Sequence, residues 1–258
     1  MLRRIMSQLA GSSVLITGAS SGIGAELARQ LVGRGCRVGL LARRRERLAA
    51  LAEELEGAGG TAAWAVADVA DGVATQRALD ALAEGLGGAD VVVANAGYGE
   101  VETPKRFAPG KALALYDVNL RGTLHVIDWA LPRFLEAGRG HLVGVASVAS
   151  YLGLPHFAAY CGSKAAMRIH LQSLRVSLAR RGIAVTTICP GFVKSELTDR
   201  HQGPMPFLLP TDRAVRRIVR AIEKRQGEVV FPWQMRLVMA IGTCLPASWV
   251  EALLRRSA

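Results

Sequence analysis

Residues Ser13–Gly24, SVLITGASSGIG, join a short apolar stretch to a run rich in glycine. The segment SVLIT predicts a buried β-strand, because β-branched side chains pack well on a pleated surface. The residues AELARQLVGRG that follow the glycines predict a helix. Between a strand and a helix, glycines let the backbone approach a phosphate, and the helix N-terminus offers free N–H groups. On its own this stretch indicates a phosphate site and an ordinary glycine-rich turn about equally.

The succession of strand and helix repeats along the chain. Continuous apolar strands that alternate with helices are typical of a parallel sheet covered on both faces. We therefore predict an α/β fold, a Rossmann-type doubly wound parallel sheet of about seven strands, in one domain over residues 1–258. Further strands are expected at Arg37–Ala42, Thr61–Val66, Ala89–Ala94, the HLVGVAS run that ends at Ser147, Ile183–Cys189 and Glu228–Phe231. Further helices are expected at Glu46–Leu55, Ala78–Leu86, Gly110–Ala137, around Tyr160 and at Thr211–Arg225.

Two arginines, Arg43 and Arg44, follow the second predicted strand. Dinucleotide-binding folds that prefer NAD(H) commonly carry an acidic residue here, which binds the ribose 2′-hydroxyl. Guanidinium groups instead suit a 2′-phosphate, because they form charge-assisted hydrogen bonds with it. The sequence therefore favours NADP(H) over NAD(H), and Arg45 and Arg47 are expected to begin the exposed face of the next helix.

The stretch Ser147–Lys164, SVASYLGLPHFAAYCGSK, holds residue types that suit acid–base chemistry. Tyr160 and Lys164 are spaced so that they lie one turn apart on the same face of a helix. An ammonium group beside a phenol favours the phenolate, so we expect the pKa of Tyr160 to fall below its usual value of about 10. With the hydroxyl of Ser147 nearby, this pair predicts a general acid/base that works at neutral pH.

Composition narrows the classes of function. The net charge of +11 favours anionic ligands, but no nucleic-acid-binding module accompanies it, so no nucleic-acid partner is expected. The scattered cysteines indicate buried thiols in a reducing, cytoplasmic setting, and the histidines lack the spacing of metal ligands, so no metal is expected. The basic start lacks the apolar region of a signal peptide. The uncharged run LVMAIGTCLPASWV is too short to span a bilayer.

Several motifs together resemble the short-chain dehydrogenase/reductase family over residues 12–195, in the family's order and spacing. The resemblance implies a catalytic tetrad of Asn119, Ser147, Tyr160 and Lys164. It also implies a dinucleotide held by several motif residues, together with Arg43, Arg44, Tyr160 and Lys164. These motif residues are Gly18, Ser20, Ser21, Gly22, Ile23, Gly24, Asp68, Val69, Asn95, Ala96, Gly97, Pro190, Gly191, Val193 and Ser195.

The chemistry that the resemblance implies is a hydride transfer between a nicotinamide and a carbonyl or alcohol carbon. Tyr160 then donates or removes the proton, while Lys164 lowers the pKa of Tyr160 and binds the nicotinamide ribose. Ser147 holds the substrate oxygen, in a hydrogen bond that strengthens as negative charge develops there. Asn119 supports a water that links Lys164 to solvent, and Asp68 hydrogen-bonds near the adenine.

Residues 196–258 are expected to form a substrate lid and C-terminal helices. Apolar residues of the lid, among them Met205, Phe207, Leu208 and Leu209, suggest a medium-sized, lipophilic small-molecule substrate. Two short amphipathic helices broken at Pro246 are predicted to follow. They would close the cleft, pack on a partner such as the second subunit of a homodimer, lie on a membrane surface, or pack on the core, and core packing is the expectation.

Two other classes of function stay open. One is a cofactor-binding sensor or scaffold that does no chemistry, although such proteins usually show a broken tetrad. The other is an epimerase or dehydratase on a similar fold, which typically needs a larger C-terminal domain than the residues after Ser195 provide.

Overall fold

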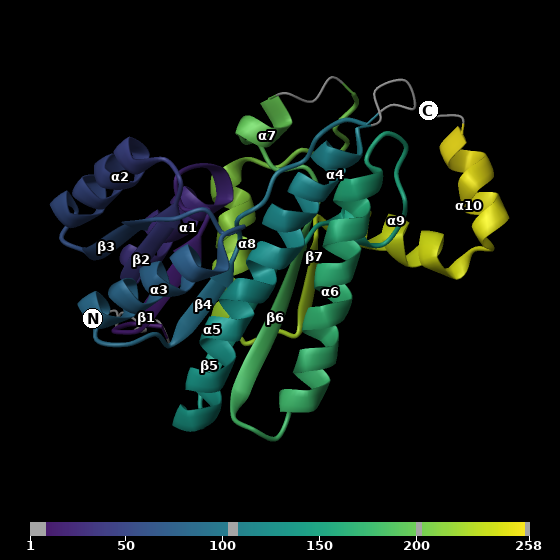
Figure 1. Cartoon of the computed structure of the whole chain (residues 1–258). Helices are drawn as coiled ribbons and strands as arrows, with labels where there is room; N and C mark the ends of the chain where they lie inside the picture. Colours follow the sequence, from purple (N-terminus) through teal and green to yellow (C-terminus); the bar gives the residue numbers. More distant parts are fainter. Residues whose placement is uncertain (1–8, 103–107, 200–202, 256–258) are drawn as a thin grey trace, which may run out of the picture.

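The computed structural model describes residues 9–102, 108–199 and 203–255, which build a seven-stranded parallel sheet with helices on both faces (Figure 1). The order across the sheet is β3-β2-β1-β4-β5-β6-β7, and every neighbouring pair is parallel. This arrangement confirms the predicted Rossmann-type fold. The strands are β1 (Ser13–Thr17), β2 (Arg37–Ala42), β3 (Thr61–Val66), β4 (Val91–Ala94), β5 (Gly140–Val145), β6 (Ile183–Pro190) and β7 (Glu228–Phe231).

Each face of the sheet has its own apolar core. On one face α1 (Gly22–Val32), α2 (Arg45–Gly57) and α8 (Thr211–Glu223) pack through buried residues such as Leu27, Leu48 and Ile218. On the other face α3 (Gly72–Leu86), α5 (Gly122–Ala137) and α6 (Ala158–Leu178) pack through residues such as Leu79, Trp129 and Leu171. Strands buried on both faces explain why the sequence shows continuous apolar runs instead of an alternating pattern.

The strand order reverses between β1 and β4. From β1 the chain builds outward to β2 and β3, and it then returns to β4 on the other side of β1. In open α/β sheets, ligands bind at the carboxyl ends of the strands at such a switch point. The glycine-rich turn and the Asn95-Ala96-Gly97 segment both lie there, because they directly follow β1 and β4.

The single helix expected over Gly110–Ala137 has three parts. These are α4 (Pro109–Tyr116), a π-helical turn at Asp117–Arg121, and α5. The backbone carbonyl of Asn119 in the wide turn accepts a hydrogen bond from Thr123 Oγ1 over 2.9 Å. A π turn inserted in a helix often marks a functional site. The predicted helix at Ala78–Leu86 also begins earlier, at Gly72, because the side chain of Asp71 caps it.

The C-terminal residues form α9 (Trp233–Cys244) and α10 (Ala247–Leu254), which break at Pro246 as predicted. Helix α9 buries Met235 and Met239. Helix α10, whose residues are all described, has no buried side chain and lies at the edge of the molecule, apart from the sheet (Figure 1). The expectation of core packing is therefore wrong for α10. The thiol of Cys244 is likewise exposed, while the other three cysteines are buried as expected.

Within the described residues, no helix has both the length and the apolar character needed to cross a membrane.

Candidate active site

Two positions of the turn between β1 and α1, Gly18 and Gly24, have room only for glycine. A Cβ atom at Gly24 would lie 2.4 Å from the carbonyl oxygen of Gly18, and one at Gly18 would lie 2.8 Å from Cα of Ala96. Gly18 and Gly22 also have φ angles of 68° and 53°, which disfavour any other residue. In the described structure Ser21 makes no side-chain capping bond to α1. The N–H groups in the first turn of α1, including that of Ile23, can therefore bind another acceptor.

The end of β4 braces this turn. Thr17 Oγ1 accepts hydrogen bonds from the backbone N–H groups of Asn95 and Ala96, each over 3.1 Å. Asn95 Nδ2 donates to the carbonyl oxygen of Thr17 over 2.9 Å. The side chain of Asn95 thus acts by fixing the glycine turn. Its predicted direct contact with a cofactor stays a prediction.

Arg44 reaches from the end of β2 to the glycine turn. Its Nε donates to Ser20 Oγ over 3.0 Å, and one terminal nitrogen donates to Ser21 Oγ over 2.5 Å. Arg43 donates to Asp68 Oδ2 over 3.3 Å. Both predicted arginines therefore lie beside residues of the predicted cofactor site, at the carboxyl ends of β2 and β3.

Glu196 and Arg47 pair with each other near the end of β2, which the sequence did not reveal. We call the region where β2 is followed by α2, with Arg44 and Arg47, the arginine corner. Glu196, the first residue of helix α7 (Glu196–Asp199), accepts a hydrogen bond from Arg44 over 2.8 Å and pairs also with Arg47. Sequence analysis placed Arg47 on an exposed helix face and Glu196 in the lid. No local signal predicts the contact, because about 150 residues separate the two arginines from the glutamate.

Asp68 and Val69, which follow β3, have different surroundings. Asp68 Oδ1 accepts from the N–H of Ala70 over 3.0 Å, and the carboxylate stays partly exposed. Val69 is buried, and its side chain lies so close to Gly122 that a Cβ there would be 2.6 Å from Val69 Cγ2. The described contacts of Val69 are therefore packing contacts, and its assignment to the cofactor stays a prediction.

Three tetrad residues from two segments meet around the loop after β4. A Cβ at Gly97 would lie 3.0 Å from Asn119 Oδ1 and 3.1 Å from Lys164 Nζ. A Cβ at Gly99 would lie 3.3 Å from Cδ2 of Tyr160. Lys164 and Asn119 are buried, whereas Tyr160 is partly exposed. The spacing of Tyr160 and Lys164 on α6 thus directs both toward the carboxyl end of β4.

Ser147 completes the group from the end of β5. It precedes the short 3₁₀ turn Val148–Ser150, and its Oγ accepts a hydrogen bond from the N–H of Ala149 over 3.1 Å. The Ser147 side chain also lowers the pKa of Tyr160, which places the two hydroxyl groups close together. The backbone turn therefore fixes the serine hydroxyl beside the phenol.

Burial dominates the acid–base properties of the pair on α6. It raises the pKa of Tyr160, while the hydrogen bond with Ser147 lowers that pKa by a smaller amount. Burial also lowers the pKa of Lys164 to about 8. Lys164 Nζ donates to the carbonyl oxygen of Val145 over 2.8 Å. The expectation that Lys164 brings the pKa of Tyr160 below its usual value is therefore wrong for this structure, because the loss of solvation outweighs the favourable contacts.

Asn119 holds the loop after β4. Its Nδ2 donates to the carbonyl oxygen of Tyr98 over 2.9 Å and to Ser163 Oγ over 3.1 Å. Its Oδ1 accepts from the N–H of Tyr98 over 2.9 Å. Both donors of the amide are thus in use. The predicted role of Asn119 in supporting a water stays a prediction.

The segment that follows β6 also contributes residues to the predicted site. The N–H of Gly191, next to Pro190, donates to the carbonyl oxygen of Phe231 over 2.7 Å. A Cβ at Gly191 would lie 3.2 Å from Cγ of Met235, so α9 packs directly against this segment.

The same segment then returns to the glycine turn. Val193 is buried and forms a bridge with Leu209. Ser195 Cβ lies 3.4 Å from the position that a Cβ at Gly22 would take. Ser195 therefore lies beside the glycine turn, and Val193 packs two residues before it.

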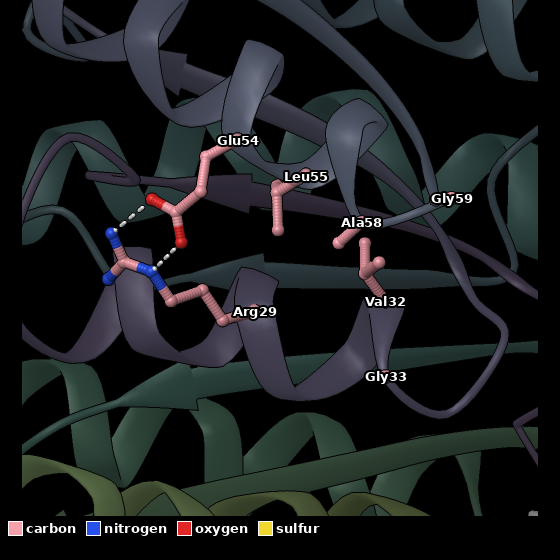
Figure 2. Close-up of a pocket in the computed structure, with 8 residues that line it drawn as sticks. Arg29, Val32, Gly33, Glu54, Leu55, Ala58 and Gly59 are labelled. Atoms are coloured by element: carbon pink, nitrogen blue, oxygen red, sulfur yellow. Dashed lines mark hydrogen bonds and ion pairs between the residues drawn. The ribbon is translucent and has the colours of Figure 1, made fainter.

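A separate hollow of about 230 Å³ lies between α1 and α2 (Figure 2). Arg29 and Glu54 pair across it through two hydrogen bonds of 2.7 and 2.8 Å. It lies at the C-terminal ends of both helices, far from the glycine turn, and it is smaller than the roughly 300–1,000 Å³ of most ligand sites. We assign no function to it. Among the described residues there is also no cluster of histidine, cysteine or acidic side chains that could hold a metal ion.

A glycine turn at the switch point of a parallel sheet, beside a loop at which Tyr160 and Lys164 meet, defines a Rossmann-type α/β protein. A sequence model of the short chain dehydrogenases matches residues 12–204. The chain belongs to the short-chain dehydrogenase family. An uncharacterized oxidoreductase of Myxococcus xanthus is 41% identical over 251 residues, which cover 97% of this chain and 99% of the relative.

Solved structures show the same architecture. A short chain dehydrogenase of Burkholderia cenocepacia in complex with NADP has 26% identity and a TM-score of 0.79, over 87% of this chain and 97% of that chain. A short chain dehydrogenase/reductase of Burkholderia phymatum in complex with NAD has a TM-score of 0.84, over 96% of this chain and 97% of that chain. Its identity is 22%, so this likeness concerns the fold alone.

Proposed function

We propose that this protein is an NADP(H)-dependent oxidoreductase that interconverts a carbonyl and an alcohol in a small lipophilic molecule, with Tyr160 as general acid/base. The observation that carries the proposal is the convergence of Ser147, Tyr160 and Lys164 beside Gly97 and the glycine turn. Membership of the short-chain dehydrogenase family supports the class of reaction.

The residues present fit a nicotinamide dinucleotide. The close approach of Gly24 to Gly18 leaves bare backbone where a pyrophosphate would lie, next to the N-terminus of α1. The structure of the Burkholderia cenocepacia enzyme, which is in complex with NADP, supports a nicotinamide dinucleotide. The choice of NADP(H) rests on Arg43 and Arg44, whose guanidinium groups suit a 2′-phosphate. When bound, the nicotinamide would supply or accept the hydride.

Tyr160 is suited to handle the proton. Because its pKa is raised by burial, the phenol is neutral at pH 7 and has a proton to donate to the alkoxide oxygen formed by reduction. Ser147 Oγ already accepts a hydrogen bond from Ala149, so its own hydrogen can be directed at that oxygen. This hydrogen bond strengthens as negative charge develops on the substrate. In the oxidation direction Tyr160 takes the proton back.

Lys164 supplies a positive charge behind the phenol. With a pKa of about 8, the amine is mostly protonated at pH 7. One of its three N–H donors is used by Val145, which leaves two for the ribose hydroxyls of a nicotinamide nucleotide. The same charge stabilises the phenolate that remains after Tyr160 has given up its proton.

The surroundings of Ser147 support an apolar substrate. Next to it, Val148 packs with Met235 and Met239 of α9, and Leu152 and Phe192 lie against this cluster. A hollow of about 330 Å³ lies between the loop at Gly153–Pro155 and α10. The exposed Phe207 and Leu208 add apolar surface to the segment before α8.

Turnover measurements test the proposal. Purified protein with NADPH and a panel of ketones and aldehydes should oxidise NADPH, and Tyr160→Phe should lower kcat by about 10²–10⁴-fold. Tyr116→Phe is the matched control, because it removes a phenol hydroxyl that lies against Gly162 of α6 and does not belong to the tetrad. Tight NADPH binding without any turnover would favour the alternative of a catalytically silent sensor or scaffold.

The cofactor preference has its own test. Arg44→Ala should weaken the binding of NADPH by about 10- to 100-fold and that of NADH much less, because a hydrogen bond to a charged group contributes roughly 1.5–3 kcal/mol. Isothermal titration calorimetry measures both affinities. Equal losses for the two nucleotides would count against a 2′-phosphate subsite at this corner.

The exposed apolar side chains of α9 and α10 support a contact with a membrane surface or with a second copy of the chain. Trp233, Leu237, Trp249 and Leu253 are each more than half exposed. Peripheral membrane contact and a homodimer both stay predictions for this face. Flotation with lipid vesicles tests the first and sedimentation velocity tests the second. The free, mostly buried cysteines support the proposed cytoplasmic setting.

A further inference from the structure

The first residue of helix α7 ties this helix to Arg44 and Arg47. Glu196 Oε2 lies 2.8 Å from a terminal nitrogen of Arg44, and Glu196 Oε1 pairs with Arg47. The two guanidinium groups lower the pKa of Glu196 to about 2. The carboxylate is therefore charged at every pH at which the protein would work. Both arginines belong to the corner where β2 enters α2, whereas α7 follows the segment that leaves β6.

The next residue of α7, Leu197, lies near Gly99 and Tyr160. A Cβ at Gly99 would lie 3.6 Å from Leu197 Cδ1 and 3.3 Å from Cδ2 of Tyr160. Leu197 and Tyr160 therefore flank the same glycine. Helix α7 lies above the ends of the strands, between α2 and α4 (Figure 1). It thus connects the arginine corner with the surroundings of the general acid/base.

The carboxylate of Glu196 stands where an anionic ligand would bind. Arg44 is fixed against the glycine turn by Ser20 and Ser21, and Glu196 takes the remaining terminal nitrogen. Guanidinium groups prefer planar, bidentate acceptors, and a phosphate group competes for the same donors with a larger negative charge. A 2′-phosphate at this corner would therefore meet donors that are already occupied by a side chain of the substrate-side segment.

We propose that Glu196 is a latch that the 2′-phosphate of NADP(H) displaces from Arg44 and Arg47, which releases α7 from the cofactor side when the phosphorylated nucleotide binds. NAD(H), which lacks the phosphate, leaves the latch closed. This inference rests on the proposed function and adds to it that a residue outside the tetrad links the choice of nucleotide to the helix beside the substrate.

The test compares the affinities of NADPH and NADH in the wild-type protein and in Glu196→Gln. Without the competing charge, NADPH should bind about 2- to 5-fold more tightly, as expected for the loss of an exposed ion pair, while NADH should bind as before. Asp199→Asn is the matched control, because it removes the same charge from the other end of α7. It should leave the ratio of the two affinities unchanged.

Hydrogen exchange in the wild-type protein gives a second measure. The N–H of Asp199 donates to the carbonyl oxygen of Ser195, so its exchange reports on the order of α7. NADPH should speed this exchange relative to NADH. Equal exchange with the two nucleotides would contradict the release of the helix.

The other outcomes are equally decisive. Weaker NADPH binding in Glu196→Gln would show that the glutamate orders the arginines instead of competing for them, and equal tightening of both nucleotides would show a general charge effect. Either result overturns the latch. A wild-type protein that binds NADPH no better than NADH would refute the proposed cofactor preference. A clear NADPH preference that Glu196→Gln leaves unchanged would refute the latch alone.

Discussion

Lys164→Met should abolish turnover and yet make the protein more stable. The ammonium group is buried, and burial lowers its pKa from the usual 10.5 to about 8. The folded state therefore holds the charged form less well than the unfolded chain does. Methionine has a similar length and carries no charge, so it removes this penalty together with the chemistry that depends on the amine.

The size of the effect follows from the pKa difference. A difference of about 2.5 corresponds to roughly 3 kcal/mol, at about 1.4 kcal/mol for each unit. Almost all of this penalty is present at pH 7, below both pKa values. The variant also loses the hydrogen bond from Nζ to Val145, which costs about 1 kcal/mol. We therefore expect the free energy of unfolding to rise by about 2 kcal/mol.

The pH dependence gives a second signature. Between pH 8 and 10.5 the folded protein has released the proton of Lys164 and the unfolded chain still holds it. The stability of the wild-type protein therefore gains from rising pH over this range, and the advantage of Lys164→Met shrinks accordingly.

Urea denaturation followed by tryptophan fluorescence, at pH 7 and pH 10, measures both quantities. Lys224→Met is the control. This lysine is exposed at the end of α8, and its loss should change stability by less than about 0.5 kcal/mol. A Lys164→Met protein less stable than the wild type at pH 7, or one with the same advantage at both pH values, would refute the reasoning.

Three further predictions concern the turn, the core and the C-terminal face. Gly24→Ala should destabilise the protein by about 1–3 kcal/mol and abolish NADPH binding, because its Cβ would lie 2.4 Å from the carbonyl oxygen of Gly18; thermal unfolding and calorimetry measure the two effects. His141 is buried and has a pKa of about 4, so at pH 5 the unfolded chain binds a proton there and the folded protein does not. Relative to His141→Gln, the wild type should therefore lose about 2 kcal/mol of stability between pH 7 and pH 5, which urea denaturation measures. Replacing Trp249 and Leu253 together by serine should change the free energy of unfolding by less than about 0.5 kcal/mol for each residue, because both side chains are exposed.

Matched variants make these outcomes specific. Gly57→Ala, at a position with open space around it, should stabilise α2 slightly. The exposed His170→Gln should keep the acid dependence of the wild type. The reasoning fails if Gly24→Ala binds NADPH normally or if His141→Gln loses stability in acid as the wild type does. A loss above about 2 kcal/mol in the double serine variant would show that α10 is packed after all.

Local patterns in the sequence predicted most of the fold. The strand Glu228–Phe231 and the break at Pro246 were placed correctly, because a short apolar run and a proline each act on their immediate neighbours. The start of α3 was missed by six residues, since Ala78 begins the apolar pattern while the polar first turn is held by the cap at Asp71. The π turn at Asp117–Arg121 was not predicted.

In the candidate site, too, the sequence predicted positions that depend on local spacing, but not properties that depend on burial or on distant segments. The positions of Tyr160 and Lys164 follow from helical spacing, and the structure brings them together beside Gly97 and Gly99. The direction of the change in the pKa of Tyr160 depends on burial, which no spacing reveals. The contact of Glu196 with the arginine corner likewise arises only when β2 and β6 come to lie in one sheet.

The side-chain amide of Asn119 forms hydrogen bonds with both the N–H and the C=O of Tyr98, as the backbone of a neighbouring β-strand would. A carboxylate of the same shape would face a carbonyl oxygen it cannot satisfy, and glutamine would be one methylene too long. The start of the loop that carries Gly99 past the phenol is therefore anchored to the wide turn of the helix. A displacement of that turn would therefore move Gly99 against the ring of Tyr160.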